Sequence, residues 1–537
     1  MLGLAAIACT LLWFALLAQR PLFDPDEGRY AEIPREMLSG GDWVIPHLDA
    51  LVYLEKPPLQ YWLTALSLRG FGENEFAARL CTGLAGYLSL GIVFLVARHL
   101  WGAEAGFRAL LFTSASSLFV LLGHQLTLDM LLSFCLSAAL GCFLVAQAGR
   151  NERGSWRAWM LGCWAAMAFA VLTKGLIGVL IPAASLGLYI LWQGDSWLLR
   201  RLNLRWGLPL FLGLATPWFL AAARENPRFL TFFFVREHLQ RFLTPIEHRT
   251  EPWWFFLPVL VIGILPWLAQ VCRSVAATIA NRAPRGEFDA ARLLLMWGLF
   301  VVIFFSFSDS KLIPYILPAV PALALLCASG KAADNPAALL IGALLTLAAC
   351  AGILAYTSGI GSSAESRELL ALIRSTLFWT CALLALGALI CAVCVLKARP
   401  LAALTGLCGS WFLATSTLLV AAIPAAPLYS AKNVAAVLLS QAAPADPIFA
   451  VQSYQQSLPF YLRHPVTLVN YRDEFDLGLT QDPDRGIETL QQFSQVWRGL
   501  NAGFAVLPWR TRDRLAAQGL PMREIAHFPD RVIISRR

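Results

Sequence analysis

Apolar stretches of the length of a membrane-spanning helix recur from Met1 to Ala422, and this feature constrains the fold more than any other. The chain is 58% hydrophobic and only 14% charged, which lies outside the range of soluble domains. A helix needs about 20 apolar residues to cross a bilayer. We therefore predict a polytopic α-helical membrane protein with about thirteen transmembrane helices. The predicted spans are 1–19, 78–97, 105–122, 128–147, 156–172, 175–193, 206–223, 253–272, 291–307, 313–328, 337–356, 374–396 and 401–423.

Basic residues in the short loops predict the orientation, because such residues stay on the cytoplasmic side. They are Arg98, Arg108, Arg150, Arg153, Arg157, Arg200, Arg201, Arg205, Arg273, Arg282, Arg285, Lys331, Lys397 and Arg399. All of these loops fall on one side, so the amino terminus is expected inside and the carboxyl-terminal tail outside. The first span lacks a positive flank and a cleavage site, so we expect a retained helix. The net charge of +8 comes largely from these loops, and we expect no nucleic-acid partner.

We expect two domains. Residues 1–423 would form a transmembrane catalytic domain that includes an exported segment, 20–77, and an exported loop, 224–252. Residues 424–537 would form a soluble α/β domain, because helix-like and strand-like pieces alternate there. These pieces are 431–440, 447–451, 466–470, 486–496, 504–507, 510–518 and 531–535. The tail has no glycine-rich nucleotide loop, and all twelve cysteines lie inside predicted spans, which argues against an exported disulfide framework or a metal site.

The segment 24–58 concentrates carboxylates, cations and aromatic residues directly behind the first span. Charge at this position would lie at the membrane surface, where the headgroup of a phosphate-bearing lipid also lies. Helical spacing from Asp26 to Met37, followed by Gly40 and Gly41, predicts an interfacial helix. Asp26, Glu27, Arg29, Glu55 and Lys56 are therefore candidates for contact with a lipid headgroup.

Further polar residues are expected on the same side. Asp129 begins the fourth predicted span, and a set of cationic or hydrogen-bonding groups suits a phosphate. This set comprises Arg29, Lys56, Lys174, Arg236, His238, Arg241 and Lys311. The simpler interpretation is that interfacial carboxylates are solvated or paired, that basic side chains snorkel, and that the tyrosines and tryptophans form an aromatic belt. An ion-coupled transporter is disfavoured, because the centres of the spans are almost free of charge.

Five motifs carry a family resemblance. They are DEGRYAEIPREM, GDWVIPHLDALVYLEKPPLQYW, HQLTLDM, LTKG and SKLIPYILPAVPALALL. In order and spacing these motifs resemble the lipid A aminoarabinose transferase family, whose members are membrane glycosyltransferases of the C type related to protein O-mannosyltransferases. The resemblance extends across nearly the whole chain, and the first two motifs are the specific ones.

The resemblance implies transfer of 4-amino-4-deoxy-L-arabinose from undecaprenyl phosphate to a lipid A phosphate, on the periplasmic face of a bacterial inner membrane. Resistance to polymyxin and other cationic peptides would follow, because the added amine offsets phosphate charge. No cofactor or metal would be required, and the enzyme would act as a monomer among membrane lipids. The alternatives left open are another sugar or acceptor, protein or lipid, and a lipid flippase without catalytic activity.

The resemblance also assigns site residues. Asp26 matches the family's catalytic aspartate, Lys56 the donor-phosphate lysine, and Asp129 the acidic residue of the next exported loop. The expected substrate-binding residues are Glu27, Arg29, Tyr30, Tyr53, Glu55, Arg236, His238, Arg241 and Tyr315. We expect a single displacement with inversion at the anomeric carbon. Asp26 would orient the acceptor, stabilise oxocarbenium character or bind the amino group of the sugar.

Overall fold

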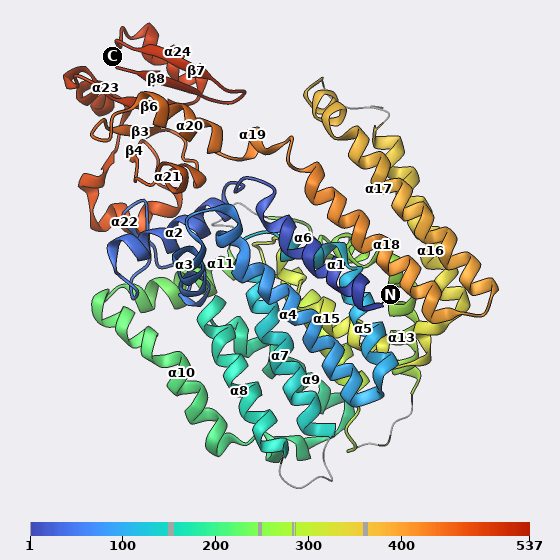
Figure 1. The fold of residues 1–537 in the computed structure, drawn as a ribbon. Coiled ribbons are helices and arrows are strands. Elements are labelled where there is room, and N and C mark those ends of the chain that lie inside the picture. The colour runs from blue at the N-terminus through green and yellow to red at the C-terminus, as the bar shows by residue number, and fades with distance from the viewer. Residues whose placement is uncertain are drawn as a thin grey trace. The chain divides into compact units, whose positions relative to one another are not determined.

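The computed structural model describes residues 2–148, 155–244, 250–281, 284, 286–357 and 364–536. Four of the basic loop residues used for orientation, Arg150, Arg153, Arg282 and Arg285, lie outside this part of the chain, as do residues 245–249 of the predicted exported loop. The chain forms two compact units (Figure 1). The first contains Met1–Leu16 and Cys81–Ala422, and the second contains Leu17–Leu80 and Ile423–Arg537. The segment expected to join the transmembrane domain thus groups with the tail.

The first unit is helical. Its helices are α1 (Leu2–Ala15), α4 (Glu75–Trp101, of which the first six residues belong to the second unit), α5 (Ala103–Ser114), α6 (Ser117–Gly123), α7 (Leu128–Ala148), α8 (Ser155–Lys174), α9 (Ile177–Gln193), α10 (Leu204–Glu225), a π-helix (Thr231–Gln240), α11 (Arg241–Leu243), α12 (Phe256–Gly263), α13 (Leu268–Ala280), α14 (Ala290–Ser306), α15 (Ala319–Ala328), α16 (Pro336–Thr357), α17 (Ala364–Leu396) and α18 (Pro400–Ala421). In Figure 1, α8 lies between α7 and α10.

Seven helices among the described residues are long and apolar enough to cross a membrane, or up to nine if each of two bent pairs is one span. Four shorter apolar helices accompany them: Gly3–Ala18, Ile177–Gln193, Ala290–Ser306 and Ile313–Ala328. Each of the thirteen predicted stretches coincides with one of these helices or pairs. The chain is a multi-pass membrane protein, while the number of thirteen crossings stays a prediction.

Two of the predicted spans are broken. Helices α5 and α6 meet at 71°, and α12 and α13 meet at 79°. Pro266 lies in the second break, where a proline cannot continue the helical hydrogen bonds. In the first break, Ser116 caps α6 by accepting from Phe119 N–H at 3.3 Å and donates to the carbonyl of Gly263 at 2.8 Å. The two breaks are therefore joined by a hydrogen bond that satisfies exposed backbone groups.

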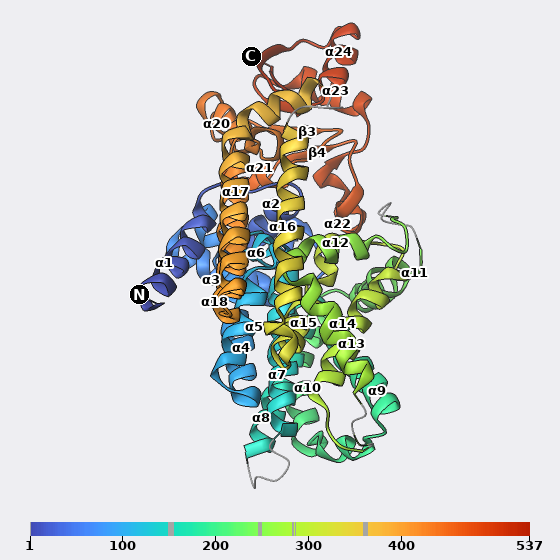
Figure 2. The ribbon, with the colours of Figure 1, turned by 90° about the vertical axis from the view of Figure 1, so that its right-hand side faces the viewer.

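Helices α16, α17 and α18 run side by side (Figure 2). A Cβ atom on Gly387 of α17 would meet the side chain of Ser410 on α18, and one on Gly406 would meet Ile390. Small residues at such a contact let two membrane helices approach closely. Across the group, Trp411 Nε1 donates to Thr346 Oγ1 at 2.8 Å, a hydrogen bond well suited to an apolar environment.

The second unit combines the exported segment with the tail. The segment forms α2 (Asp26–Gly40), a hairpin of β1 (His47–Leu48) and β2 (Leu51–Val52), and α3 (Leu59–Phe71). Helix α2 ends as predicted, because Gly41 adopts φ +74°, a left-handed conformation that suits glycine. Its interfacial position stays a prediction.

The tail is an α/β domain, as expected. Its elements are α19 (Ala426–Tyr429), α20 (Lys432–Gln441), β3 (Ile448–Val451), α21 (Ser457–Leu462), β4 (Thr467–Val469), α22 (Asp476–Gln481), β5 (Gly486–Ile487), α23 (Leu490–Gly499), β6 (Phe504–Leu507), α24 (Trp509–Ala517), β7 (Arg523–His527) and β8 (Val532–Ser535). The sheet order is β5-β4-β3-β6-β8-β7, with β3 to β6 parallel and β8 antiparallel to both neighbours. Phe449, Phe493 and Trp497 belong to its buried core.

Candidate active site

Asp26 begins α2 and keeps a third of its side chain exposed (34%). Its described partner is Arg29, one helical turn later, whose Nη1 lies 3.3 Å from Asp26 Oδ1. Arg29 is buried, and its Nε forms an ion pair with Glu474 of the tail. The guanidinium therefore lies between one buried and one accessible carboxylate, and Asp26 stays available to a ligand.

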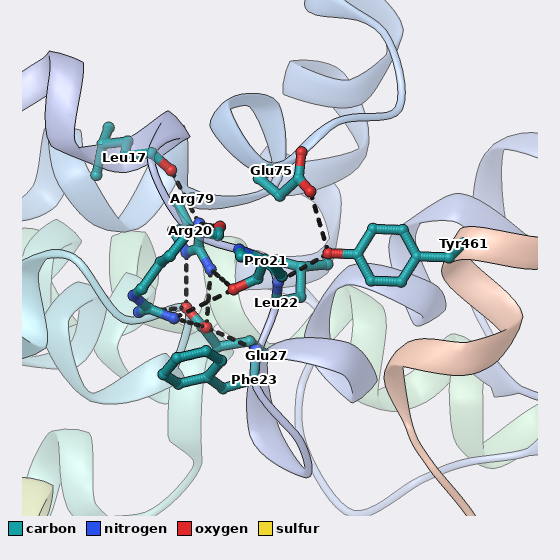
Figure 3. A network of polar contacts seen from close by, with 9 residues as sticks. All are labelled: Leu17, Arg20, Pro21, Leu22, Phe23, Glu27, Glu75, Arg79 and Tyr461. Carbon is teal, nitrogen blue, oxygen red and sulfur yellow. Dashed lines mark hydrogen bonds and ion pairs between the residues drawn. The ribbon is translucent and has the colours of Figure 1, made fainter. Parts of the chain in front are cut away.

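The neighbouring Glu27 has the opposite environment, since its side chain is completely buried, and Figure 3 shows the polar groups that contact it. Arg79 donates to it at two points, Nε to Oε1 at 2.7 Å and Nη2 to Oε2 at 2.9 Å. Arg20 also forms a two-point ion pair with it, and Phe23 N–H donates to Oε2 at 2.9 Å. Burial raises the pKa of this carboxyl, but the two guanidinium groups outweigh that effect and hold the pKa well below its usual range. Glu27 is thus an ionised structural anion, and its predicted contact with substrate stays a prediction.

Arg79 completes the network through the main chain. Its remaining N–H groups donate to the carbonyls of Leu17 at 2.9 Å, Arg20 at 2.7 Å and Pro21 at 2.7 Å. A guanidinium has five N–H donors, and all five are used here. Arg79 therefore holds both the Glu27 side chain and the turn that leads from the first helix into α2 (Figure 3).

The second motif places its aromatic and charged groups beside the first. Tyr53 is buried, and its pKa is raised well above the usual value by burial and by Glu55, against the opposing effect of Arg29. Tyr30 stacks obliquely on Tyr61, with ring centroids 6.1 Å apart. Arg29, Tyr30, Tyr53 and Glu55 are thus brought together as predicted neighbours.

Lys56 follows the hairpin and precedes α3. Its Nζ donates to the main-chain carbonyl of Glu55 at 3.1 Å and lies 3.8 Å from Glu55 Oε2. Both side chains are mostly buried, with 12% and 17% exposed. The ammonium group of Lys56 therefore lies beside a carboxylate in a mostly buried position, and its contact with the donor phosphate stays a prediction.

Asp129 and Tyr315 lie in the first unit. Asp129, in the first turn of α7, forms an ion pair with Lys174, the last residue of α8. The ammonium group of Lys174 also lies 4.5 Å from the centroid of the Tyr315 ring, a cation–π contact. The motifs HQLTLDM, LTKG and SKLIPY therefore meet at one place, with Lys174 at its centre.

Three predicted residues belong to the π-helix and its end. His238 Nδ1 lies 2.7 Å from the carbonyl of Phe233, which can only accept, so this nitrogen carries the proton. His238 Nε2 then accepts from Leu176 N–H at 3.3 Å, beside Gly175, where a Cβ atom would collide with the ring. Arg241 Nη1 donates to Glu237 at 2.9 Å, and Arg236 lies over the ring of Phe232.

Sequence reasoning missed Arg20, Arg79 and Glu474 as supports of the site. Arg79 had a usable signal, because it is a charged residue just inside a predicted apolar span. Arg20 directly follows the first span and resembled an ordinary interfacial cation. Glu474 lies in an acidic stretch of the tail, where nothing local distinguishes it from its solvated neighbours.

Comparison with known proteins decides the family. Residues 434–536 match the profile described as the aminoarabinose transferase C-terminal domain, and residues 55–220 match that of dolichyl-phosphate-mannose-protein mannosyltransferase. The crystal structure of ArnT from Cupriavidus metallidurans bound to undecaprenyl phosphate superposes with a TM-score of 0.92. That match has 32% sequence identity and covers 100% of this chain and 98% of the other. The chain belongs to the ArnT family of aminoarabinose transferases.

Two other members of the ArnT family align over part of their length. The undecaprenyl phosphate-alpha-4-amino-4-deoxy-L-arabinose arabinosyl transferase 2 of Pseudomonas fluorescens is 35% identical over 337 residues, and the corresponding transferase of Yersinia enterocolitica is 35% identical over 336 residues. Each alignment covers 61% of this chain. The chain spans 55% and 58%, respectively, of the length of these curated relatives. The predicted family resemblance is confirmed.

Proposed function

We propose that this chain is an integral membrane glycosyltransferase that moves 4-amino-4-deoxy-L-arabinose from undecaprenyl phosphate to a lipid A phosphate. The observation that supports this most strongly is the fit of the whole chain to an ArnT that binds undecaprenyl phosphate. The accessible Asp26 carboxylate, held beside Arg29, supplies a group for the reacting sugar. Resistance to polymyxin and cationic peptides follows from the added amine.

The reaction in this proposal is a single displacement with inversion. A lipid A phosphate oxygen forms a bond to the anomeric carbon while the bond from that carbon to the undecaprenyl phosphate oxygen breaks, and the electron pair leaves with the phosphate. Lys56, Arg241 and Tyr315 stabilise the charge on the leaving phosphate by charge-assisted and phenolic hydrogen bonds. The attacking phosphate is already an anion, so Asp26 and Asp129 orient the acceptor, bind the sugar amine or stabilise oxocarbenium character. No metal or cofactor takes part.

The proposal includes a topology. Thirteen helices cross a bacterial inner membrane, the chain acts as a monomer, and the segment 20–77 and the tail face the periplasm. The basic short loops support this orientation. An alkaline phosphatase fusion at the carboxyl terminus should be active, whereas a fusion after Arg98 should be inactive. The reverse pattern would contradict the proposed sidedness.

The test of the activity uses purified protein in detergent with a defined undecaprenyl-phosphate aminosugar and lipid A. Wild-type protein should produce modified lipid A, detected by mass spectrometry, and Asp26→Asn and Lys56→Ala should lose this product while remaining folded. Exposed residues provide matched controls, Asp484→Asn and Lys397→Ala, which should keep wild-type activity. If both lipids emerge chemically unchanged with the wild-type protein, the transferase proposal fails and a flippase or lipid-binding role gains support.

A further inference from the structure

Asp24, two residues before Asp26, is hydrogen-bonded to the tail. Asp24 accepts from Ser457 at both carboxylate oxygens, from N–H at 2.6 Å and from Oγ at 3.1 Å, and its own N–H donates to the carbonyl of Tyr429 at 2.7 Å. Ser457 is the first residue of α21 and is completely buried. The main chain and side chain of Asp24 are therefore hydrogen-bonded to the tail, the side chain to the start of helix α21.

A second connection lies two residues after Asp26. A Cβ atom on Gly28 would come within 2.6 Å of Ser457 Cα and 2.5 Å of the carbonyl carbon of Gln456. These are main-chain atoms that cannot move independently, so the first turn of α2 packs directly on the backbone of α21. Only glycine permits this approach.

The third connection fixes Arg29. Its Nε pairs with Glu474, which also accepts from Gln456 Nε2 at 2.7 Å. Glu474 is buried, so its charge interacts with the guanidinium through little solvent. Since Arg29 is the described partner of Asp26, the tail carboxylate helps to set the orientation of the pair.

The fourth connection precedes α2. Leu22 N–H donates to the phenol oxygen of Tyr461 at 2.8 Å, and the phenol donates to Glu75 Oε1 at 3.1 Å (Figure 3). Lys432 Nζ donates to the same carboxylate oxygen at 2.6 Å. The main chain leading to Asp26 is thus held by a tail phenol, opposite the Arg79 and Glu27 network.

We propose that Ser457, Tyr461 and Glu474 of the tail are positioning residues for Asp26 and Arg29, so that the tail is a working part of the transferase site. This inference rests on the proposed function, because it assigns the reacting role to Asp26. A group held by neighbours with satisfied hydrogen bonds needs little rearrangement to act, and displacements near 1 Å can cost about 100-fold in rate. The four connections surround Asp26 while leaving its own carboxylate accessible.

The kinetic test compares variants with matched controls elsewhere in the chain. The full-length variants are Ser457→Ala, Tyr461→Phe and Glu474→Gln, and their controls are Ser440→Ala, Glu488→Gln and Tyr356→Phe, the last at an exposed tyrosine of α16. The positioning variants should lower kcat about 10- to 100-fold with a nearly unchanged KM for the donor. The controls should keep wild-type kinetics, and melting temperatures should show that all six proteins remain folded.

Two substitutions of Asp24 test the connection to Ser457. Asp24→Asn keeps an oxygen that accepts from Ser457 and should retain most of the activity. Asp24→Ala removes this acceptor and should lower kcat as Ser457→Ala does. Equal kcat values in the positioning variants and their controls would overturn the inference. A fall in activity that only follows the folded fraction would also overturn it, because that result indicates a purely structural tail.

Hydrogen exchange separates this inference from the proposed function. If wild-type protein transfers no sugar, the proposed function fails, and exchange across residues 22–30 still tests the connections. Glu474→Gln and Ser457→Ala should speed exchange in this stretch by about tenfold or more relative to their controls. Unchanged exchange would show that the tail does not hold the segment.

Discussion

Arg79 and Glu27 form a two-point ion pair in which both side chains are completely buried. Ionised groups lose their hydration when buried, so they persist only where partners replace the water. Here Arg20 and three main-chain carbonyls supply those partners. The network anchors the residue next to Asp26 and leaves Asp26 itself accessible.

Breaking this pair should destabilise the second unit strongly. Glu27→Ala would leave two buried guanidinium groups without their carboxylate, and Arg79→Ala would leave Glu27 with Arg20 as its remaining guanidinium partner and three main-chain carbonyls without their donor. We expect a loss of about 3–5 kcal/mol with a clear drop in melting temperature. The ion pair of Arg463, which is exposed, and Glu73, which is half-buried, provides the control, with 3.0 Å between the two groups. Arg463→Ala should cost less than about 1 kcal/mol. Similar melting temperatures for the Arg79 and Arg463 variants would contradict the role assigned to burial.

Gly28→Ala should disturb the packing of α2 on α21. The new methyl group would overlap main-chain atoms of Gln456 and Ser457, so the two helices must separate. We expect a lower melting temperature and reduced transfer activity. Gly40→Ala is the matched control, because open space surrounds Gly40 at the other end of α2 and alanine favours a helix. A Gly28 variant as stable as the Gly40 variant would refute the close contact.

Asp24 should make stability depend on pH. Burial raises its pKa from 3.8 to about 7, although Ser457 and Arg531 lower it in part and Glu474 adds to the rise. Between about pH 4 and 7 the folded state keeps a proton that the unfolded state releases, so stability falls as the pH rises through this window. Asp24→Asn should flatten that slope in thermal melts between pH 5 and 8. The lowered pKa of Glu27 acts in the opposite direction, because its contribution to stability is lost as the pH falls below its ordinary pKa of 4.5.

Asp129 and Lys174 allow stability to be separated from chemistry. Asp129→Asn or Lys174→Met alone leaves one charge without its partner at the ends of α7 and α8, and each should destabilise the protein. The double variant removes both charges, so its loss should be smaller than the sum of the two by about 1–3 kcal/mol. It should nevertheless remain inactive in the lipid A assay, because Asp129 is proposed to act on substrate. Recovery of activity in the double variant would show that the pair is only structural.

Local patterns predicted much of this protein. Each predicted span coincides with an apolar helix or a bent pair, because helix length and hydropathy are properties of neighbouring residues. The end of α2 at Gly41 and the tail strand Phe504–Leu507 could be predicted for the same reason. The helix breaks near Ser116 and Ile264 could not be predicted, since a hydrogen bond from Ser116 to Gly263, 147 residues away, joins them.

The sequence by itself determined a multi-pass helical protein with an α/β tail, and it placed Asp26 and Lys56 in one polar segment. Only the tertiary structure decided that Asp26 stays accessible while adjacent Glu27 is buried and ionised. Two neighbouring carboxylates look alike in a sequence. Their difference arises because Arg79, fifty-two residues further on, packs against one of them and not the other, and the effect of a charge depends on what replaces its water.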